Sequence, residues 1–250
     1  KGNLLDVSWD VDGMSRDELY SILSAYRRNK KYFKLKSGEL LNISESGIET
    51  LVQMQDDLNL TKSQIQSGQA ELPVFRALYL DALMKENSER LEVRLDNTFT
   101  SFMAHVDEVF AKTYTVPREI NADLRNYQKE GFAWASSLAE LGLGGILADD
   151  MGLGKTLQMI TLLHLLKNNS AEVKTNLIVC PASLLYNWGS EFQKFAPDMK
   201  IGLLAGTAAE RKAILDDYKN YDALVTSYSL LIRDIENYQS KTFDIEIIDE

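Results

Sequence analysis

The stretch LADDMGLGKTLQ, Leu147–Gln158, decides the fold. It follows the phosphate-binding pattern G-x-x-x-x-G-K-[ST] except at the first position, where Asp149 stands in place of glycine. The apolar run Gly145–Ala148 before the pattern predicts a strand, and the residues from Lys155 to about Leu166 predict a helix. A glycine-rich turn between a strand and a helix is the context in which this pattern binds nucleotide phosphates.

Each residue type in the loop has a chemical reason to be there. Gly152, Leu153 and Gly154 form the cradle, because glycine lets backbone N–H groups approach an anion closely. Lys155 is expected to reach the β- and γ-phosphates, and the Thr156 hydroxyl is expected to ligate Mg²⁺. An aspartate at position 149 is compatible with phosphate binding if its side chain points away from the anion.

Short apolar strands alternate with helices on both sides of this loop. Further strands are predicted at Leu177–Cys180, Ile201–Leu204, Ala223–Thr226 and Asp244–Ile248, and further helices at about Leu124–Leu141 and Ala182–Phe195. This alternation is typical of a mainly parallel sheet covered on both faces, so the fold class is α/β.

The regular alternation of helices and short apolar strands begins only after Thr115-Val116-Pro117, and we predict a domain boundary there. Residues 1–115 predict a small α+β domain, and residues 116–250 predict the P-loop lobe. The cues in the first domain are an alternating strand (Leu5, Val7, Trp9, Val11), a capping box from Ser15 to Glu18, a hairpin turning at Lys36–Gly38, a helix opening at Pro73 and an amphipathic helix from Phe99 to Phe110. The basic run Arg27–Lys31 is interpreted as a solvated helix end rather than a DNA contact.

Composition narrows the class of protein. The net charge of −10 counts against a chain whose whole surface binds nucleic acid, although it permits a local phosphate-binding surface. The single cysteine, Cys180, excludes an intrachain disulfide and fits a reducing compartment. No apolar run is long enough to span a membrane, and we expect a cytoplasmic protein. His105 and His164 are expected to pack or cap, because neither they nor Cys180 have metal-ligand spacing.

Two other segments carry candidate chemistry. Asp249 and Glu250 end the predicted strand Asp244–Ile248, where Asp249 can hold Mg²⁺ and Glu250 can orient and deprotonate an attacking water. The amide of Gln128 has the donor and acceptor that an adenine edge needs, but in isolation a surface helix residue is the simpler interpretation.

Five ordered segments together resemble the motifs of the Swi/Snf family, a group of ATP-dependent double-stranded DNA translocases in the superfamily-two helicase class. They are LRNYQKEG (Leu124–Gly131), LADDMGLGKT (Leu147–Thr156), VCPASLLYNWGSEF (Val179–Phe192), VTSY (Val225–Tyr228) and IIDE (Ile247–Glu250). The family has aspartate at the first-glycine position, and Asp150 replaces its glutamate with the same charge. The first domain resembles, more loosely, the region that precedes the motor in bacterial members, on the hairpin Tyr32–Gly38.

The resemblance implies two RecA-like lobes with ATP and Mg²⁺ between them. It implies that Gln128 reads adenine with Arg125 beside it, and that Asp249 and Thr156 hold Mg²⁺ while Lys155 and Glu250 serve catalysis. It also implies that Ser183, Asn187, Thr226 and Ser227 face a DNA backbone; for Ser183 and Thr226, capping is an equal alternative. Trp188, Phe192 and Phe195 are interpreted as helix core.

The expected partner is double-stranded DNA, with a DNA-bound protein as a further candidate; we expect no membrane partner and a nucleoid-associated monomer. The arginines that the second lobe supplies in this family are not in these 250 residues, so the chain by itself is expected to be nearly inactive. Two alternatives remain: an RNA-directed helicase of the same superfamily, and a protein-recruiting first domain beside a regulated or vestigial motor.

Overall fold

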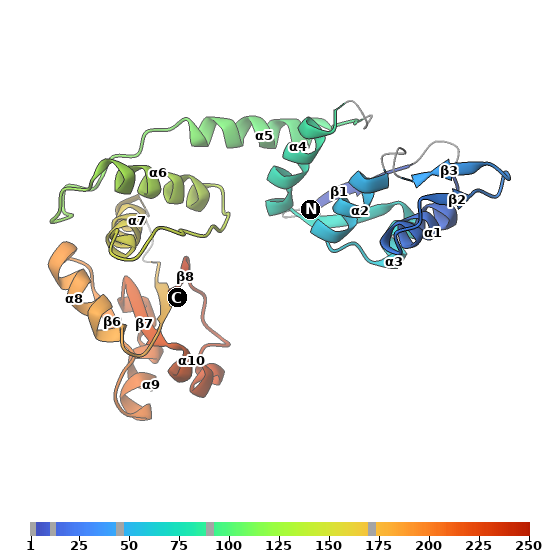
Figure 1. The fold of residues 1–250 in the computed structure, drawn as a ribbon. Coiled ribbons are helices and arrows are strands. Elements are labelled where there is room, and N and C mark those ends of the chain that lie inside the picture. The colour runs from blue at the N-terminus through green and yellow to red at the C-terminus, as the bar shows by residue number, and fades with distance from the viewer. Residues whose placement is uncertain (1–3, 11–13, 44–47, 89–92, 170–173) are drawn as a thin grey trace. The chain divides into compact units, whose positions relative to one another are not determined.

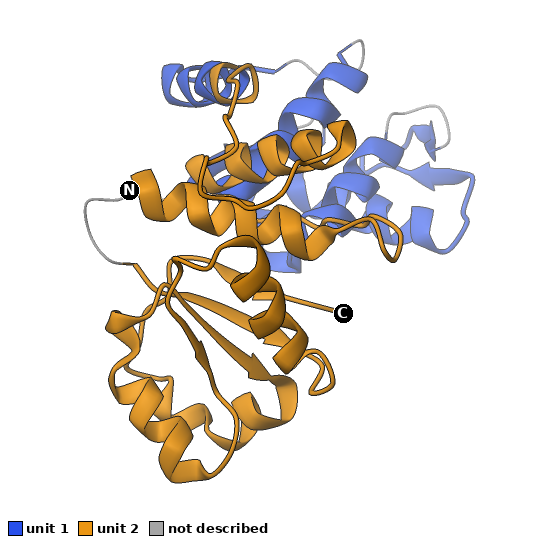
Figure 2. Cartoon of the chain, turned by 90° about the vertical axis from the view of Figure 1, so that its left-hand side faces the viewer, with its two compact units in different colours: residues 1–107 blue, residues 108–250 orange. Residues whose placement is uncertain are grey.

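The computed structural model describes residues 4–10, 14–43, 48–88, 93–169 and 174–250. The chain forms two compact units, residues 1–107 and 108–250, shown in different colours in Figure 2. The division lies within helix α5 (Asn97–Phe110), shortly before the boundary predicted at Thr115–Val116. Among the described helices, none is both long and apolar enough to cross a bilayer.

Unit 1 has α and β elements, as predicted. Its other elements are β1 (Leu4–Ser8), α1 (Arg16–Arg27), β2 (Tyr32–Lys34), β3 (Leu40–Asn42), α2 (Ile48–Asp57), α3 (Lys62–Ser67), β4 (Gln69–Pro73), the 3₁₀ turn η2 (Val74–Arg76) and α4 (Ala77–Glu86). Strand β1 pairs antiparallel with β4, and β2 pairs antiparallel with β3 (Figure 1). Pro73 thus ends a strand that the sequence analysis missed, and Val11 of the predicted first strand lies outside the described residues.

The capping box predicted at the start of α1 is confirmed. The Ser15 hydroxyl accepts from the backbone N–H of Glu18, and the Glu18 carboxylate accepts from the backbone N–H of Ser15. Helix α1 then buries Leu19, Ile22 and Leu23 in the core of the unit. The beginning of this helix was therefore readable from local sequence, because its capping partners are only three residues apart.

Unit 2 is built around a four-stranded sheet of order β6-β7-β5-β8 in which every pair is parallel. Its elements are α6 (Asn126–Glu140), α7 (Lys155–Asn169), β5 (Asn176–Cys180), α8 (Leu185–Phe195), β6 (Ile201–Leu203), α9 (Ala208–Asp216), η3 (Tyr218–Asn220), β7 (Ala223–Ser227), α10 (Tyr228–Arg233), η4 (Ile235–Asn237) and β8 (Glu246–Ile248). The α/β class and the parallel sheet are confirmed.

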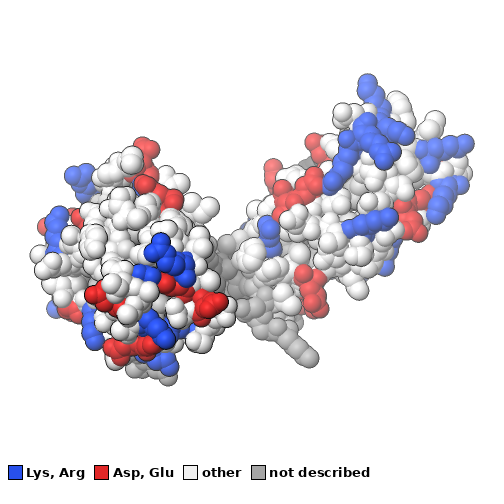
Figure 3. Space-filling view, turned by 90° about the horizontal axis from the view of Figure 1, so that it is seen from below, with Lys and Arg blue, Asp and Glu red and all other residues white. Residues whose placement is uncertain are grey.

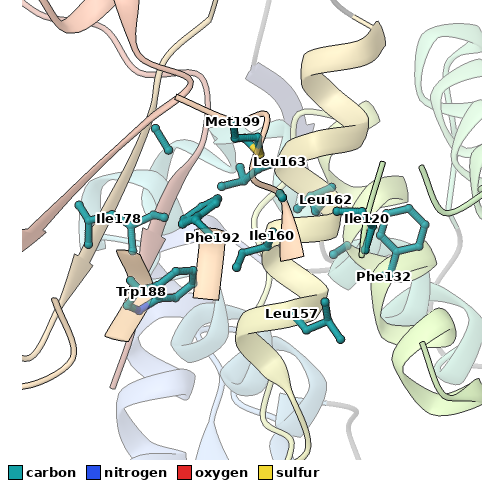
Figure 4. Close-up of a cluster of buried hydrophobic side chains, with 14 of the residues drawn as sticks. Ile120, Phe132, Leu157, Ile160, Leu162, Leu163, Ile178, Trp188, Phe192 and Met199 are labelled. Carbon is teal, nitrogen blue, oxygen red and sulfur yellow. The ribbon is translucent and has the colours of Figure 1, made fainter. Parts of the chain in front are cut away.

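Both faces of this sheet are buried, because successive side chains of a strand point to opposite sides. Ile178 and Cys180 of β5 face a cluster formed with α6, α7 and α8 (Figure 4), and Leu177 and Val179 face a second cluster that includes Leu215 of α9. Trp188 and Phe192 belong to the first cluster and Phe195 packs against it, which confirms their interpretation as helix core.

The strand predicted at Gly145–Ala148 is not formed. No described strand lies beside these residues to take their backbone N–H and C=O groups, and Ile146 is 87% exposed. An apolar run becomes a strand only where a neighbouring strand pairs with it, so this prediction is wrong for the described structure. The loop is instead positioned by side chains of α6 and α7.

Candidate functional site

The phosphate loop turns into α7 through two left-handed glycines. Gly152 and Gly154 both have φ +80°, a conformation that costs other residues strain, and α7 begins at Lys155. A Cβ at Gly152 would meet nothing within 4 Å, so this glycine is required by its backbone conformation. The turn places free N–H groups and the positive end of a helix at one point, which fits a bound phosphate chain.

Lys155 is hydrogen-bonded to the backbone of this loop. Its Nζ donates to the carbonyl oxygens of Asp149, at 2.7 Å, and Asp150, at 3.1 Å. Two oxygen acceptors on one ammonium are the kind of partners that phosphate oxygens would replace. The expected role of Lys155 as a phosphate ligand therefore fits the geometry.

Asp149, the residue that departs from the glycine pattern, is held by α7. The Nε2 of Gln158, whose side chain is fully buried, donates to Oδ2 of Asp149 at 3.1 Å. The Oε1 of the same amide has no hydrogen-bond partner among the described residues, and a Cβ on Gly131 of α6 would lie 2.0 Å from it. The carboxylate at the first-glycine position is thus engaged by a buried amide, and that amide has room only because residue 131 is glycine.

Gln128 also packs onto the loop. It is 7% exposed; its Oε1 accepts from the backbone N–H of Arg125 at 2.9 Å, and its Nε2 donates to the carbonyl of Leu153 at 2.9 Å. A Cβ on Gly154 would lie 2.5 Å from that nitrogen. The interpretation of Gln128 as a surface residue is therefore wrong. One amide N–H remains for a ligand, so adenine recognition by Gln128, beside the exposed Arg125, stays a prediction.

The Asp249 carboxylate and the backbone of Asp249 and Glu250, after β8, are held by residues from other motifs. The indole Nε1 of Trp188 donates to Oδ2 of Asp249 at 2.8 Å. The hydroxyl of Tyr228 lies 2.9 Å from the backbone carbonyls of both Asp249 and Glu250, and the Asp249 N–H donates to the carbonyl of Val179 at 2.9 Å. The sequence predicts Trp188 in the core but not this bond, for which the available signal was that a buried tryptophan usually needs an acceptor.

Asp249 is partly buried and Glu250 is exposed. Burial, followed by the charge of Asp249, raises the pKa of the Cys180 thiol to about 11, so Cys180 stays neutral. Oδ1 of Asp249 and the hydroxyl of Thr156, in the first turn of α7, are oxygen donors of the type Mg²⁺ prefers. Between described residues, no hydrogen bond or ion pair joins the phosphate loop to Asp249 or Glu250, and no cluster of three or more His, Cys, Asp or Glu forms a metal site.

The residues expected to face DNA divide into two pairs. Ser183 and Asn187 are exposed, before and within α8. Thr226 and Ser227 are 0% and 1% exposed, and the Ser227 hydroxyl accepts from the N–H of Leu230 as the N-cap of α10. Both side chains are thus buried at the end of the internal strand β7, and Ser227 is a helix cap, so a DNA contact through them stays a prediction.

His164 packs in the interior, as expected. It is fully buried on α7, and its Nε2 lies 2.9 Å from Oδ2 of Asp198. Burial of Asp198 acts to raise the pKa of its carboxyl, but the hydrogen bond and charge of His164, with Lys167 nearby, outweigh it and lower that pKa. The pair joins α7 to the turn before β6 and takes no part in the candidate site.

Comparison with known proteins identifies both units. Residues 1–117 match the family model described as bacterial SNF2 helicase associated, and residues 127–250 match the SNF2-related domain. An uncharacterised ATP-dependent helicase of Mycoplasma pneumoniae is 31% identical over 233 residues, which are 92% of this chain and 22% of that protein. One from Mycoplasma genitalium is 44% identical over 51% of this chain and 12% of its own length.

Two further matches each cover just over half of this chain. The helicase SWR1 of Saccharomyces cerevisiae is 38% identical over 54% of this chain and 9% of its own length. A SWI2/SNF2 ATPase core of Sulfolobus solfataricus, solved in complex with double-stranded DNA, is 37% identical with a TM-score of 0.47 over 55% of this chain and 28% of that one. The chain thus spans a small part of the relatives it matches.

Proposed function

Because this chain belongs to the SNF2 family, we propose that it carries the ATP-binding part of a motor that moves along duplex DNA without separating the strands. The observation that carries the proposal is the phosphate loop, with two left-handed glycines, Lys155 on its carbonyls and the amides of Gln128 and Gln158 seated against it. This arrangement suits an anion with several phosphates.

Each candidate residue has a definite task in this proposal. Loop N–H groups and Lys155 bind the phosphate oxygens, and the free N–H of Gln128 faces the base. Thr156 and Asp249 are the residues that would hold Mg²⁺, which when bound neutralises charge on the phosphates. Glu250 accepts a proton from the attacking water, and Trp188 and Tyr228 keep this carboxylate segment in place.

We further propose that the whole motor acts on duplex DNA in the cytoplasm, and that it displaces proteins bound to this DNA. Exposed Ser183 and Asn187 support this, because hydroxyl and amide groups bind a phosphate backbone without reading sequence. The 250-residue chain by itself is proposed to turn ATP over very slowly, since it covers only a small part of its relatives.

The test is the ATPase rate of the full-length protein with duplex DNA, with RNA and with no nucleic acid. We expect stimulation by duplex DNA and little by RNA, and we expect Lys155→Ala to remove turnover while DNA affinity stays nearly unchanged. Lys212→Ala, an exposed lysine of α9, is the matched control and should behave as the wild type. Stimulation by RNA alone, or unaltered turnover in Lys155→Ala, would overturn the proposal.

A further inference from the structure

Positive charge in unit 1 is concentrated at one place. Residues 27–43 contain six Lys or Arg (Arg27, Arg28, Lys30, Lys31, Lys34 and Lys36) and one carboxylate, Glu39, in a chain of net charge −10. Figure 3 shows blue side chains gathered at the right-hand end of the view, where Figure 1 places β2 and β3. We call the end of α1 with the β2–β3 hairpin, residues 27–42, the basic hairpin.

Most of these cations have no carboxylate partner. Arg27 pairs with Asp56, and the Glu18 carboxylate accepts from the backbone N–H of Lys36. Among the described residues, no carboxylate lies within ion-pair distance of Arg28, Lys30, Lys31 or Lys34. Cations at a helix C-terminus are favoured by the helix dipole, which accounts for Arg27 and Arg28 but not for the lysines on the hairpin.

The backbone holds these lysines in fixed positions. Helix α1 ends with Asn29 in the left-handed conformation, at φ 57°, and the N–H of Lys30 donates to the carbonyl of Ala25 at 3.1 Å. In the hairpin, Lys34 pairs with Leu40 and Tyr32 pairs with Asn42, so Tyr32, Lys34 and Leu40 share one face. Tyr32 is 60% exposed and Leu40 is 71% exposed, which leaves a face with an aromatic ring and a cation open to solvent.

A hollow of about 270 Å³ lies between α1 and the hairpin. It is lined by Tyr20, Ser21, Ser24, Arg28, Lys30 and Phe33. Two cations around one hollow, Arg28 and Lys30, are suitable ligands for a phosphate group, since guanidinium and ammonium groups both bind phosphate oxygens without reading sequence. The Ser21 and Ser24 hydroxyls donate to the backbone carbonyls of Asp17 and Tyr20 within α1.

In place of the solvated helix end that the run Arg27–Lys31 indicates by itself, we propose that the basic hairpin is a second duplex-DNA contact of this protein. It binds the phosphodiester backbone through Arg28, Lys30, Lys31 and Lys34, with the Tyr32 face beside them. The choice of duplex DNA as the partner rests on the function proposed above. The basic hairpin binds unit 1 to the same DNA as the motor, and it contributes affinity for DNA rather than a preference for a DNA sequence.

The test compares the 250-residue chain with two variants of equal charge. The hairpin variant carries Lys30→Gln and Lys34→Gln, and the control carries Lys212→Gln and Lys219→Gln, two exposed lysines of unit 2. Fluorescence anisotropy with a labelled duplex gives Kd at several salt concentrations. We expect the slope of log K against log salt to fall by about two in the hairpin variant, because each lost phosphate contact removes about 0.9, and to stay unchanged in the control.

Equal slopes for the hairpin variant and the control would overturn the proposal, as would no binding of duplex by the wild type at low salt. Polyglutamate is the competitor that represents an acidic protein partner, and displacement of DNA by polyglutamate as efficient as by unlabelled duplex would also contradict it. Nucleotide affinity is measured on the same samples. If the wild type binds no nucleotide but the salt slope of the hairpin variant is still smaller than that of the control, the proposed function is contradicted and the proposal for the basic hairpin is supported.

Discussion

The phosphate loop and the Asp249–Glu250 segment are held by different kinds of side chain. The loop is fixed from the interior, by the amides of Gln128 and the fully buried Gln158, and both contacts require a glycine opposite them. The carboxylate segment is fixed by Trp188, which is 2% exposed, and by the partly buried Tyr228; both belong to helices, α8 and α10, whose neighbouring residues Asn187 and Ser229 are exposed.

This difference separates two tasks. A loop fixed by packed amides keeps its shape before nucleotide arrives, which favours binding. A carboxylate fixed through α8 and the start of α10 can change position when those elements meet another molecule. Substitutions at the loop should therefore lower nucleotide affinity, and substitutions at Trp188 or Tyr228 should lower turnover.

The largest effect is expected for Gly131→Ala. Alanine normally stabilises a helix interior by about 0.5–1 kcal/mol relative to glycine, but here the added Cβ would lie 2.0 Å from Oε1 of Gln158. We expect a net loss of about 1–3 kcal/mol in the free energy of unfolding, with weaker nucleotide binding. Urea unfolding and a nucleotide titration measure the two quantities.

The control for this substitution is the same change in a Gln158→Ala background. With the amide gone the methyl group has space, so Gly131→Ala should cost little there or stabilise α6. An equal cost in both backgrounds would show that Gly131 and Gln158 are not coupled.

Trp188→Phe should affect turnover more than binding. It keeps an aromatic ring in the core but removes the donor to Asp249, a bond to a charged group worth about 1.5–3 kcal/mol. In the full-length protein we expect roughly tenfold slower ATP turnover and a higher Mg²⁺ requirement, with nucleotide affinity without Mg²⁺ unchanged. Phe192→Leu, which disturbs the same core without touching Asp249, should lower stability and leave the Mg²⁺ dependence alone; the same Mg²⁺ shift in both variants would contradict the role of the indole.

Tyr228→Phe should act in the same direction but less. One hydroxyl is lost, whose bond to the carbonyls of Asp249 and Glu250 contributes about 0.5–1.5 kcal/mol. The change in Mg²⁺ requirement is measured from the Mg²⁺ dependence of the ATPase rate. A change larger than that caused by Trp188→Phe would contradict the proposal that the Trp188 indole contributes more than the Tyr228 hydroxyl.

Asp149→Asn should have the smallest effect. If the Gln158 amide rotates, its Oε1 can accept from the new amide N–H, so affinity for nucleotide should change about twofold or less. Gln158→Glu is the comparison, since it sets a second carboxylate against Asp149. Equal nucleotide affinity in these two variants would mean that the Asp149–Gln158 contact does not shape the loop.

Local features of this chain were predictable from sequence. The capping box at Ser15–Glu18 depends on partners three residues apart, and the structure has it as predicted. The strands predicted from the apolar runs at 177–180 and 223–226 are also present, as β5 and β7, because each has paired neighbours in the sheet. The strand predicted at Gly145–Ala148 failed because pairing depends on what lies beside a segment, which its own residues do not encode.

Prediction of the candidate site from sequence is limited for the same reason. Residue types in the phosphate loop indicated its chemistry, but the contacts that fix it join residues far apart in sequence, such as Trp188 with Asp249 and Gln128 with Leu153. The burial of Thr226 and Ser227 was missed because a polar pair at a strand end can lie at the surface or beneath it. The elements packed against the end of β7, α10 among them, decide between the two.

The most direct test is an equilibrium titration of the 250-residue chain with ATP and with ADP, for the wild type, Lys155→Ala and Lys212→Ala. Lys155 is expected to exchange its carbonyl partners for phosphate oxygens, a charged hydrogen bond whose loss weakens binding about tenfold or more. Wild type and Lys212→Ala should bind alike and Lys155→Ala more weakly. Equal affinity in all three proteins, or no binding in any of them, would contradict a nucleotide site at this loop.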